Sequence, residues 1–181
     1  AQDTFFAKRN DDRKRRETER EKNKAAKKAL ISEAQSLSVS SDWKATGEKL
    51  RDLMERWKKV GHAGRMEDDA LWTEFNNARQ TFYRRREEHF NEREREWSIN
   101  RQIKQEIVSE ENRIANGGDF SRDTTERMKN LDTRWKTTGH AGRSEEERLW
   151  TEFKNAKDLF WASKRSDNEL RSRERHQRLN D

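Results

Sequence analysis

Apolar residues recur at helical spacing on both sides of a glycine-containing turn. The first set lies on one face of a helix and comprises Leu50, Leu53, Met54, Trp57 and Val60. It predicts a short helix over about 42–60, with Ser41 or Asp42 as the N-cap. The second set follows a 4-3-4 spacing and comprises Leu71, Phe75, Ala78 and Phe82. It predicts a second helix that begins near residue 66.

The second helix is predicted to be long. The chain contains no proline, and nothing between Phe82 and Ala115 breaks a helix before Asn116-Gly117-Gly118. One element of about 50 residues, or about 75 Å at 1.5 Å per residue, is expected. The alternative is a break near His89–Asn91, after which the chain folds back as a bundle with Phe90 and Trp97 in its core.

The chain contains an internal duplication. Shifting it by 78 positions lays Leu53–Tyr83 over Leu131–Trp161, and 18 of these 31 positions carry the same residue. A second internal match, at a shift of 77 positions, pairs Leu30-Ile31-Ser32-Glu33 with Ile107-Val108-Ser109-Glu110. The duplication predicts an all-α, elongated, spectrin-like or coiled-coil-like protein. Its tandem helical repeats would each consist of a short helix, a turn and a long helix, with a period of about 77–78 residues.

The first residues repeat the end of the same unit. Ala1–Phe6 matches Ala78–Tyr83 and Ala156–Trp161, so we expect a fragment of a longer array that starts inside a repeat. Three segments are predicted. Residues 1–37 form the tail of a truncated preceding repeat, as a long charged helix, residues 38–115 form repeat 1, and residues 116–181 form repeat 2, incomplete at its C-terminus.

Large apolar residues shared by the two copies form the predicted core. Their helical spacing indicates that they hold the short helix against the long one, and a stacking platform for nucleic-acid bases is the alternative. The predicted core residues are Leu53, Trp57, Leu71, Trp72, Phe75, Phe82, Leu131, Trp135, Leu149, Trp150, Phe153 and Phe160.

The repeated motif resembles the bacterial family called domain of unknown function 349. In the first copy the resemblance rests on Arg56-Trp57-Lys58, Gly61, Arg65, Leu71-Trp72, Phe75, Ala78 and Phe82. In the second copy it rests on Arg134-Trp135-Lys136, Gly139, Arg143, Leu149-Trp150, Phe153, Ala156 and Phe160. The resemblance covers nearly the whole chain and implies a bacterial, cytoplasmic, all-helical tandem-repeat protein, but it implies no activity. One departure is alanine, at Ala63 and Ala141, in a turn where many members would carry proline.

The turn Gly-His-Ala-Gly-Arg has two interpretations. A glycine-rich turn before a helix can bind a phosphate, but the carboxylates of Glu67-Asp68-Asp69 and Glu145-Glu146-Glu147 would repel one. We therefore expect the first glycine of each turn to be a left-handed C-cap and the arginine to pair with local carboxylates or carbonyls. Ser144-x-x-Glu147 is predicted to form a capping box. The turn residues are Gly61, His62, Arg65, Gly139, His140 and Arg143.

Several kinds of chemistry find no support in the sequence. Cysteine is absent, the four histidines lack metal-binding spacing, and no phosphate-binding or dinucleotide motif occurs. We expect no metal, no cofactor, no small-molecule substrate and no enzymatic activity, since thin helical bundles rarely provide a catalytic pocket. No apolar run approaches the about 18 residues of a membrane span, so no membrane partner and a cytoplasmic location are expected.

Positive charge is concentrated near the start of the chain. Residues 7–28 contain eleven basic and five acidic residues, a local excess that equals the net charge of +6 of the whole chain. A dense row of cations on a helix can track phosphates, and a solvated helix face of mixed charge is the alternative. The predicted nucleic-acid-binding residues are Arg9, Arg13, Lys14, Arg15, Arg16, Arg20, Lys22, Lys24, Lys27 and Lys28.

Two functions follow from these features. The first is non-enzymatic, sequence-nonspecific binding of structured RNA or the ribosome through the basic helical arm. The second is a protein–protein scaffold or spacer of coiled-coil type, whose partner docks on Leu30-Ile31-Ala34-Leu37 and Ile103-Ile107-Ile114. An intramolecular core explains the same two stripes.

Overall fold

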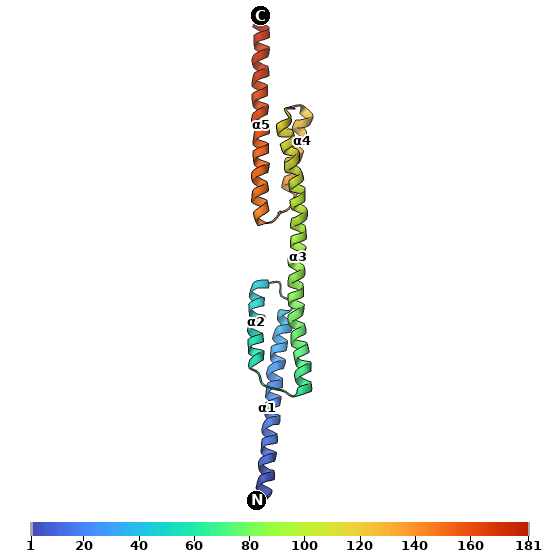
Figure 1. Cartoon of the computed structure of the whole chain (residues 1–181), viewed down its shortest axis with the longest axis vertical. Helices are drawn as coiled ribbons and strands as arrows, with labels where there is room; N and C mark the ends of the chain where they lie inside the picture. Colours follow the sequence, from blue (N-terminus) through green and yellow to red (C-terminus); the bar gives the residue numbers. More distant parts are fainter. Residues whose placement is uncertain (1, 181) are drawn as a thin grey trace. The chain divides into compact units, whose positions relative to one another are not determined.

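The computed structural model describes residues 2–180, which form five α-helices and no strand (Figure 1). The helices are α1 (Gln2–Leu37), α2 (Trp43–Lys59), α3 (Arg65–Gly117), α4 (Arg122–Thr137) and α5 (Arg143–Asn180). The chain divides between Phe90 and Asn91 into two compact units, called unit 1 and unit 2 below. Each unit holds one copy of the repeated motif, which confirms the predicted all-α class and tandem helical repeat.

Unit 1 packs three helical segments together: the C-terminal half of α1, all of α2 and the first part of α3 (Figure 1). Asp42 is the N-cap of α2, as predicted, because its carboxylate accepts a hydrogen bond from the N–H of Ala45 at 3.2 Å. The core comprises Leu30, Ile31 and Ala34 of α1, Leu50, Leu53 and Trp57 of α2, and Leu71, Phe75, Ala78 and Phe82 of α3.

Unit 2 repeats this arrangement with the last part of α3, all of α4 and the first part of α5. Its core includes Ile107, Val108 and Ile114 of α3, Met128, Leu131 and Trp135 of α4, and Leu149, Phe153 and Phe160 of α5. Both apolar stripes that the scaffold hypothesis assigned to a partner are therefore used inside the units. Leu30, Ile31, Ala34, Ile107 and Ile114 are buried, and Leu37 and Ile103 are partly buried.

Helix α3 is continuous from Arg65 to Gly117, a length of 53 residues, and passes through His89–Asn91 without a break. The alternative of a chain that folds back near Phe90 is wrong. The ring of Phe90 is 44% exposed and belongs to neither core. The helix continues because it contains no proline and no glycine before its last residue, and these residues cause most helix breaks.

The C-terminal caps of the short helices α2 and α4 differ from the predicted ones. The C-caps are Val60 after α2 and Thr138 after α4, and both have extended backbone, with ψ of 132° and 135°. Gly61 and Gly139 are therefore not left-handed C-caps. The left-handed residues of the two turns are Gly64 (φ 117°) and Gly142 (φ 97°), where a side chain would be strained.

The predicted capping box at Ser144 is not formed. Helix α5 begins at Arg143, which places Ser144 inside the first turn rather than at the N-cap. A different carboxylate closes the turn, because Oε2 of Glu146 accepts a hydrogen bond from the N–H of Ala141 at 2.8 Å. The prediction failed because it placed the start of the helix after Ser144, whereas the helix already begins at Arg143.

Two tryptophans of the predicted core lie largely outside it. Trp72 is 40% exposed and Trp150 is 49% exposed, whereas all the other predicted core residues are buried. Each covers the edge of the core, with ring centroids 5.9 Å from Trp57 and 6.0 Å from Trp135 respectively. The helical spacing placed them one residue beside the buried face, so they pack against the core with one side only.

Candidate functional site

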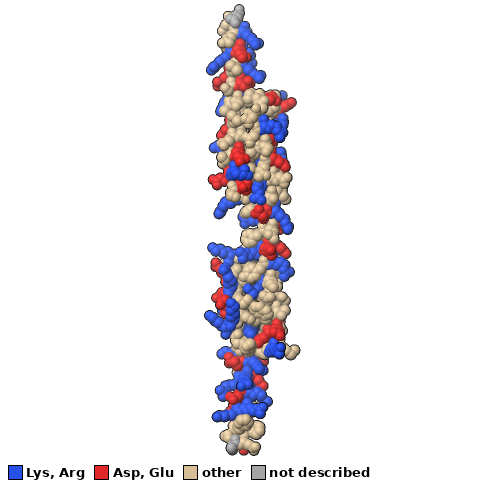
Figure 2. Space-filling model, in the orientation of Figure 1, with Lys and Arg blue, Asp and Glu red and all other residues tan. Residues whose placement is uncertain are grey.

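The basic arm of α1 is the candidate binding surface. Every residue from Phe5 to Lys22 is exposed, and Figure 2 shows Lys and Arg atoms along both sides of this segment, at the lower end of the view, with fewer acidic atoms between them. Arg9, Arg13, Arg16 and Arg20 follow a 4-3-4 spacing, which places them on one face of the helix. We call these four residues the arginine stripe.

The arginine stripe is nearly free of internal partners. Among the described residues, Arg13 donates one hydrogen bond to the side-chain oxygen of Asn10 at 3.2 Å, and the other three arginines form neither a hydrogen bond nor an ion pair. Asp12 and Glu17 border the stripe on the same open surface pocket, and Asp12 pairs with Arg15 at 3.4 Å. Lys14, Arg15, Lys22 and Lys28 are exposed but lie off the stripe.

In the corresponding part of α3, the arginines contact aromatic rings. At a shift of 77 positions, the stripe becomes Arg86, Phe90, Arg93 and Trp97. The guanidinium of Arg86 lies 5.8 Å from the ring centroid of Phe90, and that of Arg93 lies 4.6 Å from the ring of Trp97. In α3 two of the four equivalent positions are therefore aromatic, and each of the two arginines lies against one of these rings. In α1 all four positions are arginine.

Two of the predicted nucleic-acid-binding residues have a structural role instead. Lys27 is buried, its ammonium lies 2.7 Å from Oδ1 of Asp68, and it lies 5.3 Å from the ring centroid of Trp57. Lys24 pairs with Glu67 at 3.3 Å. The prediction for Lys27 is wrong because the face of α1 that carries the stripe enters the core of unit 1 near residue 23.

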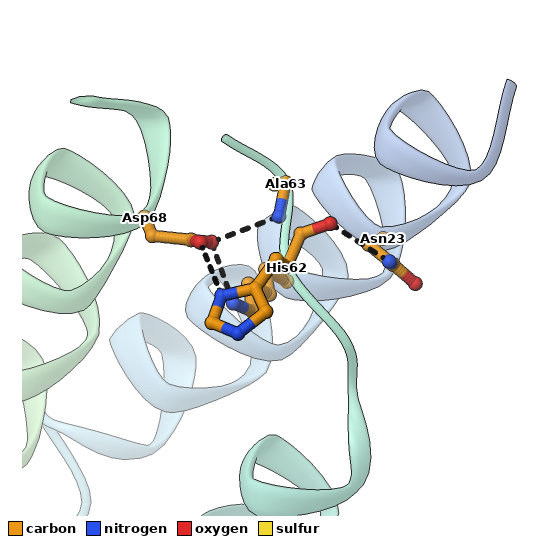
Figure 3. A network of polar contacts seen from close by, with 5 residues as sticks. Asn23, His62, Ala63 and Asp68 are labelled. Atoms are coloured by element: carbon orange, nitrogen blue, oxygen red, sulfur yellow. Dashed lines mark hydrogen bonds and ion pairs between the residues drawn. The ribbon is translucent and has the colours of Figure 1, made fainter. Parts of the chain in front are cut away.

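Lys27 belongs to a polar network that holds the turn between α2 and α3 (Figure 3). The side chain of Asn23 donates to the backbone carbonyl of His62 at 2.9 Å. Asp68 accepts from the N–H of Ala63 at 3.0 Å and from Nδ1 of His62 at 3.1 Å, besides its pair with Lys27. We call Asn23, Lys27, His62, Ala63 and Asp68 the turn network.

Unit 2 contains the same turn network with different acids and histidine contacts. Asn100 donates to the carbonyl of His140 at 2.9 Å, and Lys104 pairs with Glu146, which accepts the N–H of Ala141. Nδ1 of His140 accepts from the N–H of Gly142 at 3.0 Å instead of contacting the acid. The repetition shows that this arrangement is the standard way in which the chain fixes its turn to the preceding helix.

The acids of the turn network are held in the ionised form. Burial by itself raises the pKa of Asp68, but the hydrogen bonds from Lys27, Ala63 and His62 outweigh it and lower that pKa to about 2. Burial also raises the pKa of Glu146, but the hydrogen bonds from Lys104 and Ala141 outweigh it and lower that pKa. Because these carboxylates already occupy the N–H groups of the turn, a phosphate would have to displace them.

The sequence predicted that the arginines of the turn motif pair with local carboxylates or carbonyls, and the structure contradicts this. Arg65 and Arg143 are exposed, and within residues 2–180 they form no hydrogen bond or ion pair. His62 is also exposed, and its ring contacts only Asp68 among described polar groups. The turn thus presents basic groups to solvent.

Asn23 and Asn100 explain the first glycine of each turn. A Cβ on Gly61 would lie 2.9 Å from Nδ2 of Asn23, and one on Gly139 would lie 2.7 Å from Nδ2 of Asn100. The glycine is needed for the close approach of the asparagine, not for an unusual backbone angle.

Gly61→Ala should therefore break the Asn23 hydrogen bond and destabilise the chain by about 1–2 kcal/mol. In an Asn23→Ala background, where the clash is removed, the same change should cost much less. Urea unfolding of the two single variants and the double variant checks this through the coupling free energy. Simple additivity of the two changes would contradict the proposed contact.

Asn23, Asp68 and their counterparts were not among the predicted structural residues, although the sequence contains a signal for two of these positions. The internal match at a shift of 77 positions extends backwards from Leu30 to pair Asn23 with Asn100 and Lys27 with Lys104. A lysine repeated at the same place before an apolar stripe indicates a packing role more than a ligand contact.

Other candidate sites find no support in the part of the chain that the structure describes. No cluster of histidine and acidic side chains there could hold a metal ion. None of the described helices combines the length and the apolar composition needed to cross a bilayer.

The comparisons with known proteins identify a family. The model of the family described as Domain of Unknown Function (DUF349) matches residues 1–66 and 70–144. Neither the curated proteins nor the solved structures gave a match. Two consecutive matches cover most of the chain and agree with its internal duplication, and the chain therefore belongs to the DUF349 family.

Proposed function

We propose that the chain binds structured RNA, without sequence preference and without catalysis, through the arginine stripe of α1. The observation that supports this is the row of four exposed arginines on one helix face, of which only Arg13 has a partner within the described chain. The row runs from Arg9 to Arg20, which are about 16 Å apart along the helix axis at 1.5 Å per residue. A fixed row of guanidinium groups suits contact with several phosphates of one groove.

The composition of the arm favours phosphate contacts over base contacts. Residues 7–28 contain no aromatic side chain, and single-stranded bases are bound mainly by stacking on such rings. Guanidinium contacts to phosphates carry no base information by themselves. The arm therefore fits a duplex region of RNA, whose backbone presents phosphates at regular intervals.

The test is the affinity of the full chain for a 20-base-pair RNA duplex of arbitrary sequence at 50 and 200 mM salt. With about four phosphates neutralised, the affinity should fall about a hundredfold between the two salt concentrations. Reversal of the stripe, Arg9→Glu, Arg13→Glu, Arg16→Glu and Arg20→Glu together, should abolish binding at 200 mM and flatten the salt dependence.

A charge-matched control separates the stripe from net charge. Lys44, Lys49, Arg51 and Lys59 are exposed cations of unit 1, and changing these four to glutamate alters the net charge equally. The control variant should keep most of the salt-dependent binding. Equal loss in both variants, or binding of duplex DNA without binding of duplex RNA, would contradict the proposal.

A further inference from the structure

Unit 2 buries a carboxyl group that has no hydrogen-bond partner. Glu111 of α3 is fully buried, at 0% exposure, and among the described residues neither of its side-chain oxygens has a hydrogen-bond partner. Buried polar atoms are nearly always hydrogen-bonded, since an unpaired one costs free energy. A charged carboxylate in this position would cost far more than a neutral carboxyl group.

The first copy shows that the fold does not need a carboxyl group here. At a shift of 77 positions Glu111 corresponds to Ala34, which is also fully buried, in the core of unit 1. One of the two charged neighbours also differs, because Asp132 of unit 2 corresponds to the apolar Met54 at a shift of 78, whereas Lys157 corresponds to another cation, Arg79. The carboxyl group is thus a property of unit 2 and not of the repeat.

Two charged groups face Glu111, one from each neighbouring helix. Asp132 comes from α4 and Lys157 comes from α5. These two form an ion pair with each other, and Asp132 also pairs with Lys136 at 2.7 Å. The ammonium of Lys157 is thus held by Asp132, and among the described residues no cation forms a hydrogen bond or an ion pair with Glu111.

The protonation state of Glu111 follows from these contacts. Burial is the largest effect and raises the pKa of Glu111, Lys157 lowers it, and Asp132 raises it further, with a result of about 8. Near neutral pH the group is mostly a neutral carboxyl group in the folded chain. In the unfolded chain its pKa returns to the ordinary value of 4.5, where the group is ionised at the same pH.

We propose that Glu111 makes unit 2 a pH-responsive element, in which folding takes up a proton and acidification tightens the bundle of α3, α4 and α5. Between pH 4.5 and 8 the folded state holds one more proton at this position than the unfolded state, so stability falls as pH rises. Below 4.5 both states hold the proton, and well above 8 neither does, so the contribution is constant outside this window. Unit 1, with Ala34, has no such element.

The test compares the full chain with its Glu111→Gln variant, which keeps the shape of a neutral carboxyl group but cannot ionise. Amide hydrogen exchange should be followed in unit 2 and unit 1 separately between pH 5 and 9, after correction for intrinsic exchange rates. In the parent chain the opening equilibrium of unit 2 should grow on the order of a hundredfold from pH 5 to pH 8 relative to the variant. The opening equilibrium of unit 1 should show no difference between the two proteins.

A second measurement and a control keep the result unambiguous. Glu106→Gln removes an exposed glutamate of the same helix and should leave the pH profile unchanged. A carbon-13 titration of the Glu111 carboxyl group should show its midpoint near 8, and loss of that resonance in the variant assigns it. Parallel profiles for the parent chain and Glu111→Gln, or a titration midpoint near 4.5, would overturn the proposal.

Discussion

Replacing Trp57 by alanine should lower the free energy of unfolding by about 3–5 kcal/mol, whereas the same change at Trp72 should cost only about 1 kcal/mol. The two tryptophans belong to one aromatic cluster and differ in burial. Trp57 is 8% exposed and Trp72 is 40% exposed. Since the penalty for truncation grows with the cavity that is left, the more exposed ring should matter less.

The contacts of Trp57 explain why its loss should be so costly. Its ring stacks on Phe75 at a centroid distance of 4.4 Å and an interplanar angle of 11°. Its ring is also tilted by 54° against that of Trp72, and the ammonium of Lys27 lies 5.3 Å from its centroid. Removing it opens a cavity at the junction of the three helical segments of unit 1.

Urea unfolding followed by far-UV circular dichroism measures both changes, and Trp135→Ala with Trp150→Ala repeats the comparison in unit 2. Trp135 stacks on Phe153 at 4.3 Å, so its loss should have a similar effect. Equal costs for Trp57→Ala and Trp72→Ala would mean that the exposed tryptophan is as important to the core as the buried one, contrary to the structure.

Replacing Lys27 by methionine should cost about 2–3 kcal/mol of stability without weakening the proposed binding of RNA. The change keeps the apolar stem over Trp57 but removes the ammonium that neutralises Asp68. Breaking a buried ion pair by deleting one partner leaves the other charge uncompensated. Asp68 keeps the hydrogen bonds from Ala63 and His62, so we expect a loss at the lower end of the range for buried pairs.

The pH dependence of this variant gives a second readout. The pKa of Asp68 is about 2 in the folded chain, against 3.8 as its ordinary value, so its ionisation contributes stability above about pH 4. That contribution, about 2 kcal/mol, is lost as pH falls from about 4 to 2. In Lys27→Met the loss over this range should shrink, because the folded-state pKa moves back toward the ordinary value.

Lys28→Ala is the matched control, since Lys28 is the neighbouring lysine and is exposed. It should leave stability unchanged within about 0.5 kcal/mol. Thermal or urea unfolding between pH 2.5 and 7 and the duplex-binding assay together decide the case. Unchanged stability with weakened binding in Lys27→Met would restore Lys27 to the nucleic-acid surface and contradict the turn network.

Helical periodicity and self-comparison of the sequence were sufficient to predict most of the fold. The 4-3-4 spacing of Leu71, Phe75, Ala78 and Phe82 marks a buried face directly, and the absence of proline allows α3 to continue. Trp72 was misplaced because periodicity locates a face to within about one residue. The exposure of a large ring beside that face depends on how closely α2 approaches.

The turn network was beyond the reach of local patterns because its contacts join distant segments. Asn23 and His62 are 39 residues apart, and Lys27 and Asp68 are 41 apart. A count of charges does not distinguish an exposed basic residue from a buried one. Arg20 is exposed and Lys27 is buried, and this difference arises from the packing of α1 against unit 1. The unpaired carboxyl group of Glu111 was missed for the same reason, since the residues that affect it, Asp132 and Lys157, lie on two other helices.

The close approach of Asn23 to Gly61 has a consequence for the evolutionary record of this family. Position 61 is not free to change alone, because a side chain at 61 occupies the space of the amide at 23. Related sequences should therefore vary at the two sites together, with a bulkier residue in the turn accompanied by a shorter one on the preceding helix. Gly139 and Asn100 should form a second such covarying pair.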